Sequence, residues 1–421
     1  MIEFGAFAWV WTISGSAVAG VILRPFGLPE WIFAVAGAGL LSGLGFLPLA
    51  EVRTGIASGT DVYLFLAGMM LLAEIARREG LFSYFAAYAA RWAKGSPRRL
   101  FALVYLVGTL VTVFLSNDAT AVVLTPAVAA VARAAEARSP IPYLLVCAFV
   151  ANAASFVLPI SNPANLVVFG SEMPPLLEWL QRFSLASILS IVATFLVLRW
   201  TQREDLQGTT RADIVIPALS SGGRIAAAGV GIAAIVLLGA SASGHDLGWP
   251  AAIAGFGTLG VVLLVERTSP WAAVKAVSWD TLLLVAGLFV IVRALELSGL
   301  ERLLATALET AVAAAPDLST FGVGVLAAFG TNLTNNLPLG LIAGSVVAGA
   351  SVPERVVDAI LVGIDIGPNL SVTGSLATIL WLTALRREGL TFGAFRFLKL
   401  GFLVMPPALL LALAAIVLQP W

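Results

Sequence analysis

SNDATAVVLTP (residues 116–126) and TNLTNNLP (residues 331–338) interrupt two apolar segments of the chain with clusters of polar side chains. The segments, 100–134 and 318–350, are each too short for two full membrane spans and a loop, because one span needs about 20 apolar residues. Irregular backbone survives at membrane depth only when it is buried in protein or lines a wet cavity. We therefore predict that each segment is a re-entrant hairpin with its polar cluster at the tip.

Two further apolar segments contain helix-breaking motifs. ISNPAN (residues 160–165) divides segment 140–175, and DIGPNLSVTG (residues 365–374) divides segment 354–388. Asn-Pro and Gly-Pro-Asn end helices, because proline lacks an amide hydrogen and restricts the residue before it. We predict two broken helices at the membrane midplane. The breaks fall at Pro163, Gly367 and Pro368.

The composition requires a membrane environment. Hydrophobic residues make up 59% of the 421 residues and charged residues only 11%, against about 25% charged in a typical soluble domain. The 24 basic and 24 acidic residues balance, so the chain has no excess of positive charge for a nucleic-acid partner. These numbers exclude a soluble enzyme, a nucleic-acid binder and a disordered chain.

The remaining apolar segments complete an all-α polytopic membrane protein of the cell inner (plasma) membrane. Together with the two broken helices they give about ten transmembrane helices plus two re-entrant hairpins. No basic residue precedes the first segment, so we expect that segment to be retained rather than cleaved as a signal peptide. The uninterrupted spans are predicted at 5–23, 30–50, 61–77, 176–200, 224–243, 248–266, 279–297 and 396–419.

The chain contains an internal repeat. DVYLFLAG (residues 61–68) aligns with DTLLLVAG (residues 280–287) at an offset of 219, and Gly80 and Gly299 keep that offset. Later in each half, Asn117 and Asn335 lie 218 apart, and Pro163 and Pro368 lie 205 apart. The order of span, polar-tipped pair and Pro-broken span therefore occurs twice.

Loop charge reverses between the repeats. Residues 77–99 carry six basic and one acidic side chain, whereas the equivalent residues 296–317 carry one basic and four acidic. Residues 386–399 carry four basic and one acidic, whereas their counterpart 171–182 carries one basic and two acidic. Basic loops favour the cytoplasm. We predict two inverted-topology repeats with both chain termini outside, an arrangement typical of secondary transporters.

The repeats also predict a domain organisation. Each repeat supplies a scaffold part followed by a transport part that contains one hairpin and one broken helix. The polar stretch between the halves is predicted to be a cytoplasmic linker. The boundaries are 1–98 (scaffold) and 99–200 (transport) in repeat 1, 201–223 for the linker, and 224–317 (scaffold) and 318–421 (transport) in repeat 2.

Two carboxylates are candidate proton carriers. Asp118 lies at the first hairpin tip, where an ionised acid costs at least about 2.5–3.5 kcal/mol on insertion scales, although Ser or Asn could cap a helix as well. Asp365 lies immediately before the second break and could instead be a structural partner of free amide groups. At the second tip, Asn335 and Asn336 can cap a helix or bind a hydroxyl-rich solute.

The chain has few residues that could bind a metal ion or react as a thiol. The single cysteine, Cys147, cannot form a multi-thiolate site, and the chain has one histidine. No phosphate-binding loop motif is present in the sequence. We therefore expect no cofactor, no metal and no enzymatic activity, and any ATP-driven step would need a separate subunit.

The motifs at 116–126, 160–170, 331–338 and 364–389 resemble those of the arsenite efflux pump (ArsB) family of the ion-transporter superfamily, over essentially the whole chain. The resemblance implies export of arsenite and antimonite coupled to proton entry, either alone or with a soluble cytoplasmic ATPase. Near neutral pH arsenite is mainly an uncharged trihydroxy species, which suits amide groups. The site residues implied are Asn117, Asp118, Asn162, Asn165, Asn335, Asn336, Asp365 and Asn369.

Two related functions remain open alternatives. In a sodium (cation)/proton antiporter, Asp118 and Asp365 would bind the cation directly. In a carboxylate transporter, the hairpin tips would need neutral ligands, and Asp118 would repel an anionic substrate. The carboxylate transporter is therefore the weaker of the two alternatives.

Overall fold

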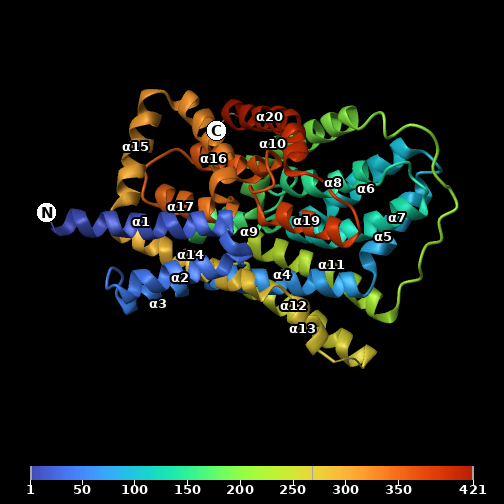
Figure 1. The fold of residues 1–421 in the computed structure, drawn as a ribbon, viewed down its shortest axis with the longest axis horizontal. Helices are drawn as coiled ribbons and strands as arrows, with labels where there is room; N and C mark the ends of the chain where they lie inside the picture. The colour runs from blue at the N-terminus through green and yellow to red at the C-terminus, as the bar shows by residue number, and fades with distance from the viewer. Residues whose placement is uncertain (1, 268, 420–421) are drawn as a thin grey trace.

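The computed structural model describes residues 2–267 and 269–419, and this part of the chain contains helices and loops but no β-strand. Most helices run along one common direction, with the N-terminus and α15 at one end of the molecule and the long irregular linker at the other (Figure 1). We call these the N-terminal end and the linker end. The all-α class predicted from the sequence is confirmed.

The first repeat ends at the linker, which is irregular from 207 to 220. Its helices are α1 (Ile2–Leu23), α2 (Glu30–Gly43), α3 (Leu49–Ser58), α4 (Thr60–Arg78), α5 (Leu81–Trp92), α6 (Pro97–Phe114), the π-helical turn η2 (Ala119–Leu124), α7 (Thr125–Ala134), α8 (Ile141–Ala153), α9 (Pro163–Phe169) and α10 (Leu176–Thr201).

The second repeat follows the linker with the same order of elements. Its helices are α11 (Ser221–Ala242), α12 (Gly248–Glu266), α13 (Trp271–Ala276), α14 (Trp279–Leu297), α15 (Leu300–Ala314), α16 (Pro316–Thr334), α17 (Asn336–Ala348), α18 (Glu354–Ile366), α19 (Leu376–Arg387) and α20 (Ala394–Leu418). Short 3₁₀ turns are present at Pro25–Gly27, Pro159–Ser161, Gly170–Glu172 and Gly367–Asn369.

Five of the described helices are long and apolar enough to cross a membrane, and two bent pairs raise the number to seven. The bends are 46° between α3 and α4 and 73° between α14 and α15. The other apolar helices have 10–17 residues, as expected where a span is broken or re-entrant. The predicted count of ten includes the two broken spans, each of which is divided into two half-helices.

Three segments differ from the sequence-based expectation. The span predicted at 30–50 ends at Gly43, and a turn through Pro48 starts the separate helix α3. The stretches 77–99 and 296–317, considered only as charged loops, contain α5 and α15. Their local apolar periodicity is strong enough for helix, although charged residues flank them.

The internal repeat is present at the level of single residues. Helix α14 begins 219 residues after α4 (60 to 279), and α16 begins 219 residues after α6 (97 to 316). Gly80 and Gly299, equivalent by sequence, have φ angles of 77° and 78°, a left-handed conformation that glycine adopts without strain. The break residues Pro163 and Pro368 are less closely equivalent, because Pro163 follows the unwound stretch and Pro368 precedes it.

Equivalent helices make equivalent contacts across the molecule. Helix α4 packs on α12, and its counterpart α14 packs on α2. A Cβ atom on Gly68 would lie 2.1 Å from the carbonyl oxygen of Ala251, and one on Gly287 would lie 2.7 Å from the carbonyl carbon of Ala34. Both glycines are therefore needed for the close approach of the two backbones.

The polar-tipped segments fold back as hairpins. In the first, Thr112 on α6 and Thr120 on η2 have their hydroxyl oxygens 2.8 Å apart, so the chain reverses between them. The second half-helices cross between the repeats: α9 packs on the hairpin helix α17, and α19 packs on η2. Each hairpin is thus held by the broken helix of the other repeat.

This topology makes a labelling prediction. In a Cys147→Ala background, cysteines at Arg91 and Arg386 should face one side of the membrane, and cysteines at Glu172 and Arg302 the other. All four positions are exposed or border exposed loops. We expect an impermeant maleimide added outside whole cells to label positions 172 and 302 only. Labelling of 172 or 302 only after permeabilisation would contradict the predicted orientation.

Candidate functional site

The first broken helix is held open by two asparagines. Helix α8 ends at Ala153, and α9 begins at Pro163 after an unwound stretch. Asn162 caps α9, because its Oδ1 accepts from the amide of Ala164 at 3.0 Å. Asn165 is fully buried, and its Nδ2 donates to the carbonyls of Ser155, Leu158 and Pro159 at 3.0–3.2 Å. It therefore satisfies the carbonyl groups that the break leaves free.

The second break is bonded to the first. Asp365, buried at the end of α18, accepts from Asn162 Nδ2 at 2.7 Å through Oδ1, whereas its Oδ2 makes no hydrogen bond within the described residues. Asn369 donates to the carbonyl of Phe149 at 3.1 Å and accepts from Asn152 Nδ2 at 3.1 Å. Asn152 was not singled out from the sequence, although an asparagine within an apolar span is a signal that could have identified it.

The first hairpin tip places a carboxylate at a cavity. Ser116 Oγ accepts from the amide of Ala119 at 3.1 Å and so caps the second helix of the hairpin. Asn117 is buried, and its Oδ1 accepts from the amide of Asp118 at 2.9 Å. Neither of these bonds uses the side chain of Asp118, which is partly exposed and lines the cavity.

The second hairpin tip has an unusual backbone. Asn335 has φ 72° and ψ 155°, a region that is essentially restricted to glycine and costs about 1–3 kcal/mol for other residues. The amide of Asn336 donates to the carbonyl of Gly374 at 3.0 Å. One turn before the tip, Asn332 donates to the carbonyl of Gly367 at 3.0 Å and its Oδ1 accepts from Ser371 at 2.6 Å. Asn332 thus fastens the hairpin to the break.

The central cavity has a volume of about 640 Å³ and opens at the linker end. Its inner part is formed where η2, α9 and α19 begin, at Ala119, Pro163 and Leu376, beside Asp118. Three helix N-termini therefore line the cavity together with one carboxylate, and each N-terminus carries a partial positive charge. Amides of their first turns are already capped by side chains: Ala119 by Ser116, Ala164 by Asn162 and Thr378 by Ser375. The charged lining residues are Glu74, Arg77, Asp118, Lys275, Arg387 and Glu388, three acidic and three basic.

Only some of the predicted site residues line this cavity. Asp118 and Pro163 do. The residues at the breaks instead hold the broken backbone together. The predicted residues that do not line the cavity are Asn117, Asn162, Asn165, Asn335, Asn336, Asp365, Gly367, Pro368 and Asn369. Cys147 is fully buried in α8 and also lies outside the lining.

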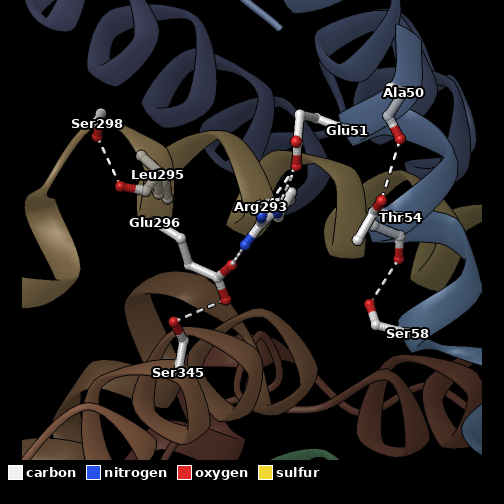
Figure 2. A network of polar contacts seen from close by, with 10 residues as sticks. Ala50, Glu51, Thr54, Ser58, Arg293, Leu295, Glu296, Ser298 and Ser345 are labelled. Carbon is white, nitrogen blue, oxygen red and sulfur yellow. Dashed lines mark hydrogen bonds and ion pairs between the residues drawn. The ribbon is translucent and has the colours of Figure 1, made fainter. Parts of the chain in front are cut away.

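The opposite end of the molecule is closed by a polar network (Figure 2). Arg293 on α14 binds Glu51 on α3 and Glu296, each at 2.9 Å. Glu296 in turn accepts from the hydroxyl of Ser345 on the hairpin helix α17 at 3.0 Å. The repeat equivalents of Arg293 and Glu296 are Glu74 and Arg77, which line the cavity at the linker end. The pair Arg293–Glu296 therefore contacts a hairpin at the N-terminal end, whereas the equivalent pair Glu74–Arg77 faces the cavity at the linker end.

Inverted repeats, re-entrant hairpins and broken helices around one cavity define a membrane transporter. The chain belongs to the family whose model is described as a citrate transporter, which matches residues 7–366.

Several relatives are similar over nearly the whole chain. An arsenical pump membrane protein of Yersinia enterocolitica is 27% identical, covering 94% of this chain and 95% of the relative. One of Escherichia coli K12 is also 27% identical, covering 95% and 96%. An uncharacterized transporter of Mycobacterium tuberculosis H37Rv is 27% identical over 85% of both chains. The resemblance to arsenite efflux pumps is thereby confirmed.

The fold is shared with a solved transporter. The crystal structure of the Alcanivorax borkumensis YdaH transporter, described as having an unusual topology, matches with a TM-score of 0.58. The match covers 92% of this chain and 96% of that one at 17% sequence identity. At this identity the similarity concerns the fold alone.

The Asn335 backbone yields a stability prediction. Asn335→Gly should raise the stability of the purified protein, by up to about 1–3 kcal/mol, because glycine adopts this conformation without strain. Asn335→Ala should not raise it, since alanine keeps the strained conformation and the Asn335 side chain makes no capping hydrogen bond. Thermal unfolding in detergent measures both variants. A lower melting temperature for Asn335→Gly than for the wild type would show that the tip is not strained.

The Asn162–Asp365 contact is testable with a double-mutant cycle. Asn162→Ala leaves the buried carboxylate without its donor and should cost about 1–3 kcal/mol. Replacing Asp365 with Leu as well should recover part of that loss, because the unpaired charge is then absent. Denaturant unfolding in detergent gives the coupling free energy. Strictly additive effects would mean that the two side chains do not interact in solution.

Proposed function

We propose that the protein is a secondary active transporter that exports arsenite and antimonite from the cytoplasm in exchange for protons. The observation that carries the proposal is the meeting of three helix N-termini with Asp118 at the inner part of the cavity. The partial positive charge of the N-termini suits oxygen atoms of the solute, and the carboxylate supplies a group that can take up and release a proton.

The charge balance of the cavity favours an uncharged solute. Its three acidic and three basic lining residues give no net attraction for an anion such as citrate. Two of the charges are already engaged with each other, since Arg77 binds Glu74 through two bonds of 2.7 Å. Neutral trihydroxy arsenite can donate hydrogen bonds to Asp118 and place its oxygen atoms at the helix N-termini, and no net charge has to be desolvated. The family description as a citrate transporter is consistent with the carboxylate alternative, which this charge balance disfavours.

Alternating access would use the inverted repeats. The scaffold parts, 1–98 and 224–317, would remain fixed while the transport parts, 99–200 and 318–421, move between the two ends. The cavity at the linker end, which we assign to the cytoplasm, receives the solute. Release outside then requires the Ser345–Glu296 contact to open and the hairpin of repeat 1 to close on α4.

Several residues keep the roles inferred from the sequence as proposals. Asp118 is the proton carrier that faces the cavity, and Asp365 is the second acid, shielded behind Asn162. Asn117, Asn335 and Asn336 would reach the solute once the transport parts have moved, and Asn165 and Asn369 shape the backbone around it. The transporter would lie in the inner membrane of the cell. A soluble ATPase, where the pump uses one, would dock at its linker end on the cytoplasmic side.

Asp118→Asn tests proton coupling. The amide keeps the shape of the side chain but cannot titrate, so the variant should bind arsenite yet lose accumulation driven by a pH gradient. The measurement is uphill arsenite movement in proteoliposomes with an imposed gradient, beside Asp365→Asn and the conservative control Asp118→Glu, which should retain activity. If Asp118→Asn and Asp365→Asn both concentrate arsenite at the wild-type rate, neither acid carries the proton.

The same vesicles separate the proposal from the cation/proton antiporter. An internal pH probe reports sodium-induced proton movement in the absence of arsenite. We expect proton movement to require arsenite or antimonite and to be insensitive to sodium. Sodium-dependent proton exchange without arsenite would assign Asp118 to cation binding instead.

A further inference from the structure

A second, smaller groove lies at the linker end between α6 and α10. Its volume is about 270 Å³, and it shares no lining residue with the central cavity. It forms where the first turn of α6 approaches the last turn of α10 and the residues that follow. The lining residues are Arg98, Leu196, Arg199, Trp200, Arg203 and Leu206.

The lining of the groove carries three basic side chains and no acidic one, and the nearest acids in sequence are Glu204 and Asp205. Arg98, Arg199 and Arg203 are exposed, and none forms an ion pair with a carboxylate of the described residues. Arg199 lies over the ring of Phe195 at 5.9 Å and Arg203 over that of Trp200 at 5.7 Å. These ring contacts limit the freedom of both guanidinium groups and leave their N–H donors available.

An apolar track continues from the groove along the membrane-spanning part of both helices. On α10, Leu185, Ile188, Val192 and Leu196 are 47–57% exposed and recur every three or four residues, so they share one face. The two helices are joined beneath the groove, since the Tyr105 hydroxyl on α6 donates to the carbonyl of Ile191 on α10 at 2.7 Å. On α6 the exposed apolar residues are Leu106, Leu110 and Phe114.

We propose that this groove binds an anionic phospholipid. The three arginines hold the phosphate of the headgroup, Trp200 lies at the level of the membrane interface, and the acyl chains follow the apolar residues of α6 and α10. Basic pockets between transmembrane helices are suited to such headgroups, and aromatic side chains are enriched at that depth. A free phosphate ion would use the arginines but gain nothing from the apolar track, which favours the lipid.

The groove is formed in part by the first hairpin of the chain. Helix α6 is the first arm of the hairpin that carries Asp118, and α10 belongs to the same transport part. A lipid held by Arg98 on one helix and by Arg199 and Arg203 beside the other would link the two at the membrane surface. The bound lipid stabilises the position of α6 on α10 in addition to the Tyr105 contact.

Native mass spectrometry of the whole protein tests the proposal. The protein is equilibrated in mixed micelles that contain phosphatidylglycerol and phosphatidylcholine, and the retained lipid is counted for wild type and for Arg98→Gln/Arg199→Gln/Arg203→Gln. Each arginine near an anionic headgroup contributes about fivefold. We expect the groove variant to lose phosphatidylglycerol by at least about tenfold while its phosphatidylcholine adducts stay unchanged.

Matched variants and a competitor make the outcome specific. Arg91→Gln/Arg99→Gln/Arg386→Gln removes three exposed arginines of the same end that lie outside the groove, and should retain the lipid. Gel filtration and thermal unfolding in phosphatidylcholine micelles show that each variant is folded, and the single variant Arg199→Gln serves if the triple variant is not. Equal retention by the groove variant and wild type would overturn the proposal. Displacement of the lipid by millimolar inorganic phosphate would reduce the groove to an anion site and overturn the assignment to lipid.

Discussion

Backbone groups freed inside a membrane must find partners within the protein, and this constraint determines the centre of the molecule. Each unsatisfied amide or carbonyl costs several kcal/mol in hydrocarbon, so a helix can break there only beside side chains that replace the lost bonds. Asn165 does this for three carbonyls of the first break, and Asn332 for Gly367 in the second. Because these asparagines supply the hydrogen bonds that the breaks remove, helix N-termini can face a cavity instead of ending at the membrane surface.

The same constraint explains why much of the fold could be predicted from sequence. A polar cluster or an X-Pro break in an apolar segment has few allowed structures, so the hairpins and broken helices followed from local patterns, and the glycine offset of 219 established the repeat. The turn after α2 was not predicted, because the mean hydropathy of a span-length window hides the short stretch 43–48. Within that stretch Gly43, Gly45 and Pro48 indicate the end of a helix. Helices α5 and α15 were not predicted because the charged residues in and around them are typical of loops, although their apolar residues keep a helical period.

The site was less predictable than the fold. Asparagine has the same sequence signature whether it binds a solute or satisfies a broken backbone, and near a break no helical period fixes which way a side chain points. Asn165 and Asn369 therefore could not be distinguished from ligands, although in the structure they bond to carbonyls and to Asn152. Asp118 was a stronger candidate than the asparagines, because a carboxylate is a costly helix cap. In the structure Ser116 makes the capping bond and Asp118 lines the cavity, and its proton role stays a prediction.

The two ends differ because one charge pair is reversed between the repeats. Arg77 lies in the last turn of α4, where a cation interacts favourably with the helix dipole, whereas its equivalent Glu296 places an anion in the last turn of α14. Glu296 therefore needs compensation, which it obtains from Arg293 and from Ser345 on the hairpin. Arg77 has less need of a hairpin partner, since the dipole and Glu74 already stabilise it. The pseudo-symmetric fold is thus biased toward closure at the N-terminal end and an open cavity at the linker end.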